Sequence, residues 1–426
     1  MKIYNPILSG FHADPSIVNA AGECFIANST FEWFPGVELH RSKDMKTWTS
    51  VPSPLSEKRL LDMAGNKASC GIWAPCLSYS DGIFYLVFTN VRSWNDGPWK
   101  DCPNFLTTAE SIEGPWSDPI FMNASGFDAS LFHDDDGRKW FVNMEWDYRQ
   151  QGPRQFSGIL VQEYDCKAKK LVGKVHKIFL GTDIGLVEGP HLYKRDGWYY
   201  LVCAEGGTSY EHAITCARSK NLFGPYEVHP ANPLITSYGY DCKIKRAGHG
   251  SWCKSPDGKK DYLVYLCGRP LEGTERCVLG RETGIAELEW KNGWPWVKQP
   301  DGTLKNCPPD YIEIKGRGII APGCGVVHAA EKYTFKNKDF LADFKTLRIP
   351  FDDKRFSISE RSGFLRIHGG QSPVSCFEQS LLARRQTDFD FVAETKMEFS
   401  PENFQHFAGM VYRYDEKSQY LCGNAK

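Results

Sequence analysis

Three carboxylate side chains occupy equivalent places in a repeated sequence element, and their types suggest acid–base chemistry. Asp14 begins the element Asp14-Pro-Ser-Ile, Asp128 begins Asp128-Ala-Ser-Leu, and Glu188 directly precedes Gly189-Pro-His-Leu. Small residues flank all three acids, which leaves room for a ligand. Hydrolysis of a glycosidic bond needs a carboxylic acid that protonates the leaving oxygen and a carboxylate opposite it. A third acid nearby would raise the pKa of the proton donor by like-charge repulsion.

The residues alone leave three questions open. Acids at strand starts also cap turns or make surface contacts, although three acids in register with one repeat favour a shared site. A carboxyl separation of roughly 6.5–9.5 Å would imply inversion at the anomeric carbon, and about 5–5.5 Å would imply retention. The pattern does not say which acid is the base. A non-catalytic sugar-binding module, with the acids as ligands for hydroxyls, is the remaining alternative.

A near-constant period organises the elements that must position these acids. Turn glycines at positions 22, 82, 137, 197 and 258 each precede an aromatic-rich apolar run, and such a period marks repeated supersecondary units. Asp-Gly between two β-rich runs, as at Asp81-Gly82, predicts a hairpin. Eight or nine residues before the glycines lie Asp14-Pro-Ser-Ile, Ala74-Pro-Cys-Leu, Asp128-Ala-Ser-Leu, Gly189-Pro-His-Leu and His249-Gly-Ser-Trp.

Three to four strands per unit and five units predict an all-β fold, a five-bladed β-propeller over residues 1–310. The innermost strands of a propeller line its channel, so the acids would meet at one mouth. A long sandwich of unrelated hairpins is the rival, and the steady period argues against it. The repeat fades after Trp296, and residues 311–325 have linker composition. Period-2 alternation over 389–399 predicts a strand in a C-terminal β-sandwich over 326–426, which ends abruptly and is expected to be incomplete or truncated.

Composition excludes several classes of partner. The net charge is −1 without a basic stripe, so we expect no nucleic acid. No apolar run reaches the ~20 residues needed to cross a bilayer, so we expect no membrane partner. The N-terminus lacks the apolar core of a signal peptide, and the 15 cysteines form no Cys-x-x-Cys spacing. We therefore expect reduced, mostly buried thiols and a cytoplasmic location.

Several long motifs resemble family 43 glycoside hydrolases, with the greatest likeness to the β-xylosidase branch of that family. The resemblance covers nearly the whole chain. The motifs that carry it are Asn5-Pro-Ile-Leu-Ser-Gly-Phe-His-Ala-Asp-Pro-Ser16, Ser29-Thr-Phe-Glu-Trp-Phe-Pro-Gly36, Gly71-Ile-Trp-Ala-Pro75, Ser125-Gly-Phe-Asp-Ala-Ser-Leu-Phe132, Glu188-Gly-Pro-His191, Ala204-Glu-Gly-Gly207 and Leu279-Gly-Arg-Glu-Thr283.

The resemblance implies a five-bladed propeller followed by a sandwich and an inverting mechanism. On matching positions, Asp14 would be the general base, Glu188 the general acid, and Asp128 the residue that tunes and orients the acid. Arg281 would hydrogen-bond sugar hydroxyls. The implied activity is an exo-β-1,4-xylosidase acting on short xylo-oligosaccharides, with α-L-arabinofuranosides as a second candidate substrate. An α-L-arabinofuranosidase or an endo-arabinanase is the alternative, because pocket shape sets the choice of sugar.

Further residues are candidates for contact with substrate. Phe31, Trp73, Phe127 and Trp146 could stack on sugar rings, although each could also pack in the core, an alternative that is weaker for Trp73 and Phe127 beside the repeated elements. His249 would lie in the channel near the substrate, and similar proteins make it a candidate ligand for a divalent ion such as calcium. No cofactor is required. A homo-oligomer is a candidate assembly.

Two departures from the branch pattern stand out. Cys76 replaces the acid that usually follows Trp-Ala-Pro, and the C-terminal domain is short.

Overall fold

The computed structural model describes residues 1–94, 97–327 and 332–426 and consists of β-strands joined by loops. Within these ranges the helical elements are two short 3-10 turns, Gly152–Gln155 and Asp339–Ala342. No helix in the described part of the chain is long and apolar enough to span a bilayer. The chain is therefore all-β, as the sequence predicts.

Five antiparallel sheets, each with four main strands, follow one another along the chain. Within each sheet the strands run outward from the first one in sequence, so every unit of the repeat builds one sheet. The sheets are β2-β3-β5-β6 (Ala13–Ala20, Glu23–Ser29, Glu38–Ser42, Trp48–Val51), β7-β8-β9-β10 (Gly71–Ser80, Ile83–Val91, Asn104–Ala109, Ile120–Asn123), β11-β12-β13-β14 (Ser130–His133, Lys139–Trp146, Phe156–Asp165, Lys170–Phe179), β15-β16-β17-β18 (Glu188–Arg195, Trp198–Glu205, Ala213–Ser219, Glu227–Val228) and β20-β21-β22-β23 (Lys245–Lys254, Asp261–Gly268, Glu282–Lys291, Trp294–Lys298).

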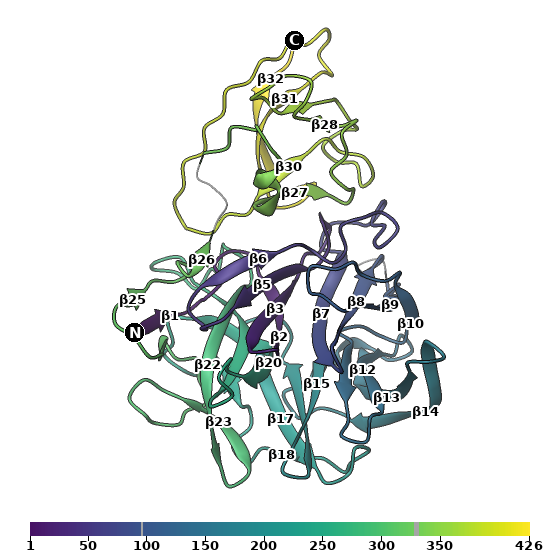
Figure 1. Cartoon of the computed structure of the whole chain (residues 1–426), viewed down its shortest axis with the longest axis vertical. Coiled ribbons are helices and arrows are strands. Elements are labelled where there is room, and N and C mark those ends of the chain that lie inside the picture. Colours follow the sequence, from purple (N-terminus) through teal and green to yellow (C-terminus); the bar gives the residue numbers. More distant parts are fainter. Residues whose placement is uncertain (95–96, 328–331) are drawn as a thin grey trace.

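The first strands of the five sheets form a closed circuit. β2 contacts β7, β7 contacts β11, β11 contacts β15, β15 contacts β20, and β20 returns to β2. The purple strands β2–β6 and the green strand β22 accordingly lie in the same region of the larger body in Figure 1. Apolar side chains fill the spaces between neighbouring sheets, and Ile26 of β3 shares one buried cluster with Val264 of β21. The first and last sheets are therefore packed together.

The innermost strands share a backbone irregularity at the repeated element. Its first residue has a positive φ in every sheet: 50° at Asp14, 37° at Ala74, 53° at Asp128, 57° at Gly189 and 37° at His249. The left-handed region is costly for residues other than glycine, and such residues cluster at functional sites. Four of the five inner strands also shift register here, and a bulge of this kind re-aims the local side chains.

The segment 311–325, predicted to be a linker, carries two short strands. Strands β24 (Tyr311–Glu313) and β25 (Ile319–Ile320) flank β1 (Lys2–Tyr4) in a three-stranded sheet. Strand β26 (Val326–Val327) adds in parallel to the outer edge of β6. The chain after the fifth sheet therefore returns to the N-terminal strand and to the first sheet.

The C-terminal region forms a smaller body above the first sheets in Figure 1, with the C-terminus at its far end. Strand β27 (Phe344–Leu347) lies between β30 (Leu382–Arg384) and β4 (Trp33–Phe34), so one sheet joins the two parts of the chain. The remaining pairs are β28 (Phe356–Ser357) with β29 (Arg366–Ile367), and β31 (Ala408–Arg413) with β32 (Gln419–Asn424).

The prediction of a strand over residues 389–399 is wrong. These residues have no strand conformation, and most of them are exposed. A strand needs a hydrogen-bonded neighbour, and no described strand pairs with this segment. The alternating pattern therefore did not suffice to form a strand here.

Candidate active site

Asp14 lies at the start of β2 with its carboxylate buried and bonded on both oxygens. The Ser29 hydroxyl donates to its Oδ2 at 2.7 Å, and Nη1 of Arg281 donates to its Oδ1 at 3.2 Å. The Asp14 side chain is 6% exposed, whereas that of Arg281 is 24% exposed. Arg281 therefore connects the buried carboxylate to the open side of the site.

His249 brings the acids of separate sheets together. Its Nδ1 atom is 3.7 Å from Oδ1 of Asp14 and 4.0 Å from Oδ2 of Asp128. Its ring also lies against Gly189, where a Cβ atom would be 2.8 Å from the His249 Nε2 atom. Glu188 directly precedes this glycine and is buried. The three predicted acids and His249 thus meet at one place.

The surroundings push the pKa values of the acids apart. Burial alone would raise the pKa of Asp14, but Arg281 and the Ser29 hydroxyl help to hold it below its usual value. Burial raises the pKa of Glu188 to about 8, with repulsion from Asp14 as the second cause. Near neutral pH, Asp14 is ionised while Glu188 largely keeps its proton. Opposed pKa values of this kind mark an acid and a base in one site.

Asp128, predicted to tune and orient the acid, is buried together with Glu188 and Asp14. Burial, followed by repulsion from Glu188 and Asp14, raises the pKa of Asp128 well above its usual value. The negative charge that raises the Glu188 pKa comes from Asp14. Two buried carboxyls that repel each other favour a state in which not both are ionised. Burial and repulsion therefore favour the protonated forms of Asp128 and Glu188, while Asp14 carries the negative charge.

Neutral imidazoles surround the acids. Burial lowers the pKa of His249, and it lowers the pKa of both His212 and His191 to about 3. Both ring nitrogens of His212 are buried without a hydrogen-bond partner. The Cys76 thiol is buried, and its Sγ lies 3.9 Å from Nδ1 of His191. The Cys76 substitution thus places a neutral thiol, with a pKa raised by burial to about 11, beside a neutral ring.

Aromatic rings confine Arg281 and continue outward along one wall. The Arg281 guanidinium carbon is 4.8 Å from the Phe31 ring centroid and 5.7 Å from that of Phe11. Phe31 then contacts Trp73 at 5.9 Å between ring centroids. Trp94 contacts the remaining predicted aromatic residues. Its ring centroid lies 4.9 Å from that of Trp73 and 5.2 Å from those of Phe127 and Trp146.

The predicted stacking residues differ in exposure. Phe31 and Phe127 are 5% and 1% exposed, so their rings are largely used in packing. Trp73 and Trp146 are partly exposed, and their indole nitrogens donate to the carbonyls of Ser69 and Pro98. The two tryptophans are therefore the members of the set that keep surface for a ligand.

Sequence reasoning missed several residues of the site. Ser29 ends the first apolar run, the one that follows Gly22, and nothing in the pattern indicates that its hydroxyl bonds Asp14. Phe11 lies within the motif around Asp14, so its neighbourhood could have been noticed. His212 and Trp94 lie outside every repeated element, and only the folded structure brings them to the cluster.

Comparison with known proteins places the chain in a family. Residues 3–295 match the family model of glycosyl hydrolases family 43, and residues 332–426 match that of the beta xylosidase C-terminal Concanavalin A-like domain. The chain belongs to glycosyl hydrolase family 43. It is therefore a glycoside hydrolase, and the predicted resemblance is confirmed.

This family 43 chain has close relatives that are named as xylosidases or arabinosidases. It is 52% identical to a xylosidase/arabinosidase 43B of Humicola insolens, over 97% of this chain and 74% of that protein. It is 46% identical to a beta-xylosidase of Bacillus subtilis, over 98% and 78% of the two chains. The solved structure of a xylan beta-1,4-xylosidase from Bacillus halodurans is similar with a TM-score of 0.87, 49% identity, and coverage of 98% and 78%.

A metal at His249 stays a prediction for this family 43 enzyme. Calcium prefers six to eight oxygen ligands, and the oxygens nearest to His249 belong to Asp14, already bonded to Arg281, and to Asp128. In the described part of the chain, the group of three metal-ligating side chains within 4.8 Å of one another is instead His12, Glu38 and His40.

Proposed function

We propose that this family 43 enzyme is an inverting exo-β-1,4-xylosidase that releases xylose from the non-reducing ends of short xylo-oligosaccharides. The observation that carries the proposal is that Asp14, Asp128 and Glu188, from separate sheets, meet in one buried cluster beside His249. The names of the relatives support xylosides as substrates and α-L-arabinofuranosides as a second substrate class.

We infer that the five sheets are the blades of a five-bladed β-propeller. The closed circuit of β2, β7, β11, β15 and β20 supports this assignment. In that arrangement the positive-φ residue of each inner strand marks one mouth of the central channel, which is where the acids and His249 meet.

The chemistry follows from the protonation states. Asp14 accepts a proton from a water molecule as the water oxygen attacks the anomeric carbon. Glu188 gives its proton to the glycosidic oxygen, so the leaving sugar departs as a neutral alcohol. One C–O bond forms and one breaks on opposite sides of the carbon, which inverts its configuration. Proton exchange with solvent then restores ionised Asp14 and protonated Glu188.

The other side chains would hold the substrate and the catalytic groups in place. Asp128 shares its proton-retaining environment with Glu188 and would orient it. Arg281, partly exposed beside Asp14, would donate to sugar hydroxyls, and the partly exposed Trp73 and Trp146 would stack on sugar rings. His249 is neutral and lies between Asp14 and Asp128, so it would donate one further hydrogen bond to the sugar or accept one from it.

Product analysis on two substrates tests the proposed function. Purified enzyme is incubated with xylobiose and, in parallel, with an aryl α-L-arabinofuranoside, and the released sugars are quantified. We expect xylose from xylobiose and near-complete loss of that activity in Asp14→Ala and in Glu188→Ala. Turnover of the arabinofuranoside alone, or of arabinan, would favour the arabinan-degrading alternative. Binding of xylobiose without its depletion would favour a sugar-binding protein.

A further inference from the structure

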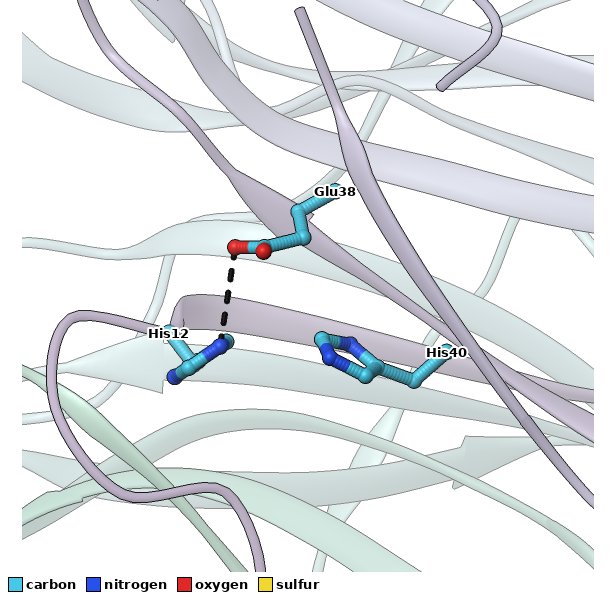
Figure 2. A group of neighbouring side chains, drawn as sticks. All are labelled: His12, Glu38 and His40. Carbon is cyan, nitrogen blue, oxygen red and sulfur yellow. Dashed lines mark ion pairs between the residues drawn. The ribbon is translucent and has the colours of Figure 1, made fainter. Parts of the chain in front are cut away.

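A second cluster of titratable side chains lies buried beside the loop that leads into β2. Nε2 of His12, in this loop, is 3.5 Å from Oε2 of Glu38 on β5, and the His40 ring is 5.3 Å from the His12 ring. Figure 2 shows the two imidazoles next to each other below the Glu38 carboxylate, with their ring planes inclined by 66°. The proposed hydrolysis uses none of these three residues.

The carboxylate of this cluster already faces a cation. Nε of Arg385, from the C-terminal region, is 3.7 Å from the same Oε2 atom of Glu38, and both side chains are largely buried. Burial would raise the pKa of Glu38, but the positive charge of Arg385 helps to hold it below its usual range, so Glu38 is ionised. Burial lowers the pKa of His12 to about 3, so His12 is neutral. A divalent ion bound at Oε2 would face the guanidinium at short range. Arg385 therefore supplies the positive charge that pairs with the buried Glu38 carboxylate.

Arg385 also grips the loop that precedes Asp14. Its Nη1 donates to the carbonyl oxygen of Phe11, and its guanidinium carbon is 5.0 Å from the Phe11 ring centroid. The next residue, Gln386, packs against Gly10 so closely that a Cβ there would be 2.5 Å from the Gln386 carbonyl oxygen. The C-terminal region thus contacts Gly10 and Phe11 at three points: the Phe11 carbonyl, the Phe11 ring and the Gly10 backbone.

The loop of residues 10–12, which Arg385 contacts, in turn limits the position of Arg281. The Phe11 ring lies 5.2 Å from the Phe31 ring, and a Cβ at Gly280, just before Arg281, would be 2.6 Å from Phe11. The amide of His12 donates to the Arg281 carbonyl at 2.8 Å. Phe11 therefore limits where the backbone and the guanidinium of Arg281 can lie.

We propose that Arg385 is a positioning residue for the glycosidase reaction, acting from the C-terminal domain through Glu38 and Phe11 to hold Arg281 in its substrate-binding position. The inference rests on the proposed function of Arg281 as a donor to sugar hydroxyls. Contacts to those hydroxyls exist in the bound ground state as well as in the transition state, so their loss raises KM more than it lowers kcat.

The test compares Arg385→Met with Arg384→Met on an aryl β-xyloside. Arg384 adjoins Arg385 and reaches Tyr333 within its own domain, so it serves as a matched control. In Arg385→Met a displaced Arg281 would lose a charged hydrogen bond to the sugar, so we expect KM to rise roughly tenfold with kcat within about twofold. The control should keep the KM of the parent enzyme. A purely structural role would lower the melting temperature and the active fraction while KM stays unchanged, and that result would overturn the proposal.

Two further variants keep the test decisive if Arg385→Met folds poorly. Arg385→Lys keeps the charge facing Glu38 and a donor for Phe11, so its KM should lie between those of the parent and Arg385→Met. Glu38→Gln should raise KM as well. In the double variant with Arg385→Met, the fold-increase in KM should be smaller than the product of the two single fold-increases, because the two residues act together. Full additivity would refute the coupling. If the parent enzyme does not hydrolyse xylosides at all, the proposed function fails, whereas an unchanged KM in an active parent background refutes only the role of Arg385.

Discussion

Arg281 contacts the general base directly, so replacing it should move the acid limb of the pH–activity profile. In Arg281→Met the hydrogen bond at 3.2 Å to Asp14 is lost, while the carboxylate stays buried. Burial is the largest influence on the Asp14 pKa, and it acts upward. Without the cation, this pKa should therefore rise.

The size of the shift can be bounded from the site. An adjacent arginine typically lowers the pKa of an aspartate by about 1–3 units, so its removal should raise the pKa by the same amount. His249 moderates the effect, because Arg281 also lowers the pKa of His249 and the freed imidazole can pair with Asp14 at 3.7 Å. We therefore expect the acid limb to move up by about 1–2 units. The alkaline limb should also rise, because Arg281 lowers the pKa of Glu188.

The assay is kcat/KM against pH on an aryl β-xyloside, which reports the ionisations of the free enzyme. Ser29→Ala is the graded control, since it removes a neutral hydrogen bond of 2.7 Å to Asp14 without removing a charge. Its acid limb should shift upward by less than that of Arg281→Met. An acid limb that stays in place in Arg281→Met, or moves to lower pH, would refute the assignment of Asp14 as the ionised base.

Three other outcomes are expected. Glu188→Gln should lose about 10²–10⁴-fold in kcat on xylobiose but much less on aryl xylosides with good leaving groups, and equal losses would contradict its role as the acid. Ala21→Asn should raise the melting temperature by about 1–3 °C, because Ala21 has a φ of 51° in an exposed hairpin turn that favours asparagine, and a lower melting temperature would count against this turn geometry. Enzyme treated with a chelator should keep its activity within about twofold. A larger loss that calcium restores would point to a cation beside His249.

The repeat could be recognised in the sequence because every sheet needs the same kind of hairpin between paired strands. A hairpin needs turn residues with positive φ, and Asp81-Gly82 and Asp196-Gly197 have φ values of 54° and 81°, and 51° and 72°. The five inner elements were aligned by residue type alone, and all five begin with a positive-φ residue in the structure. The convergence of Asp14, Asp128 and Glu188 followed from this register.

Other features depend on contacts that no local pattern encodes. His212 approaches the acids only because separate sheets meet, and Ser29 reaches Asp14 through the register in which β3 pairs with β2. The strand predicted over 389–399 did not form, since alternation supplies a face but not the hydrogen-bonding partner that a strand needs. Arg385 reaches Phe11 across 374 positions of sequence, a separation at which composition carries no information.

The stereochemistry of the first product tests the central claim most directly. Proton NMR during the earliest turnover of an aryl β-xyloside distinguishes the two anomers of free xylose before they equilibrate. Ionised Asp14 activating water opposite protonated Glu188 predicts α-xylose as the first-formed sugar. β-Xylose as the first-formed sugar would mean that a carboxylate attacks the sugar itself, and the assignment of Asp14 as the base of an inverting enzyme would be wrong.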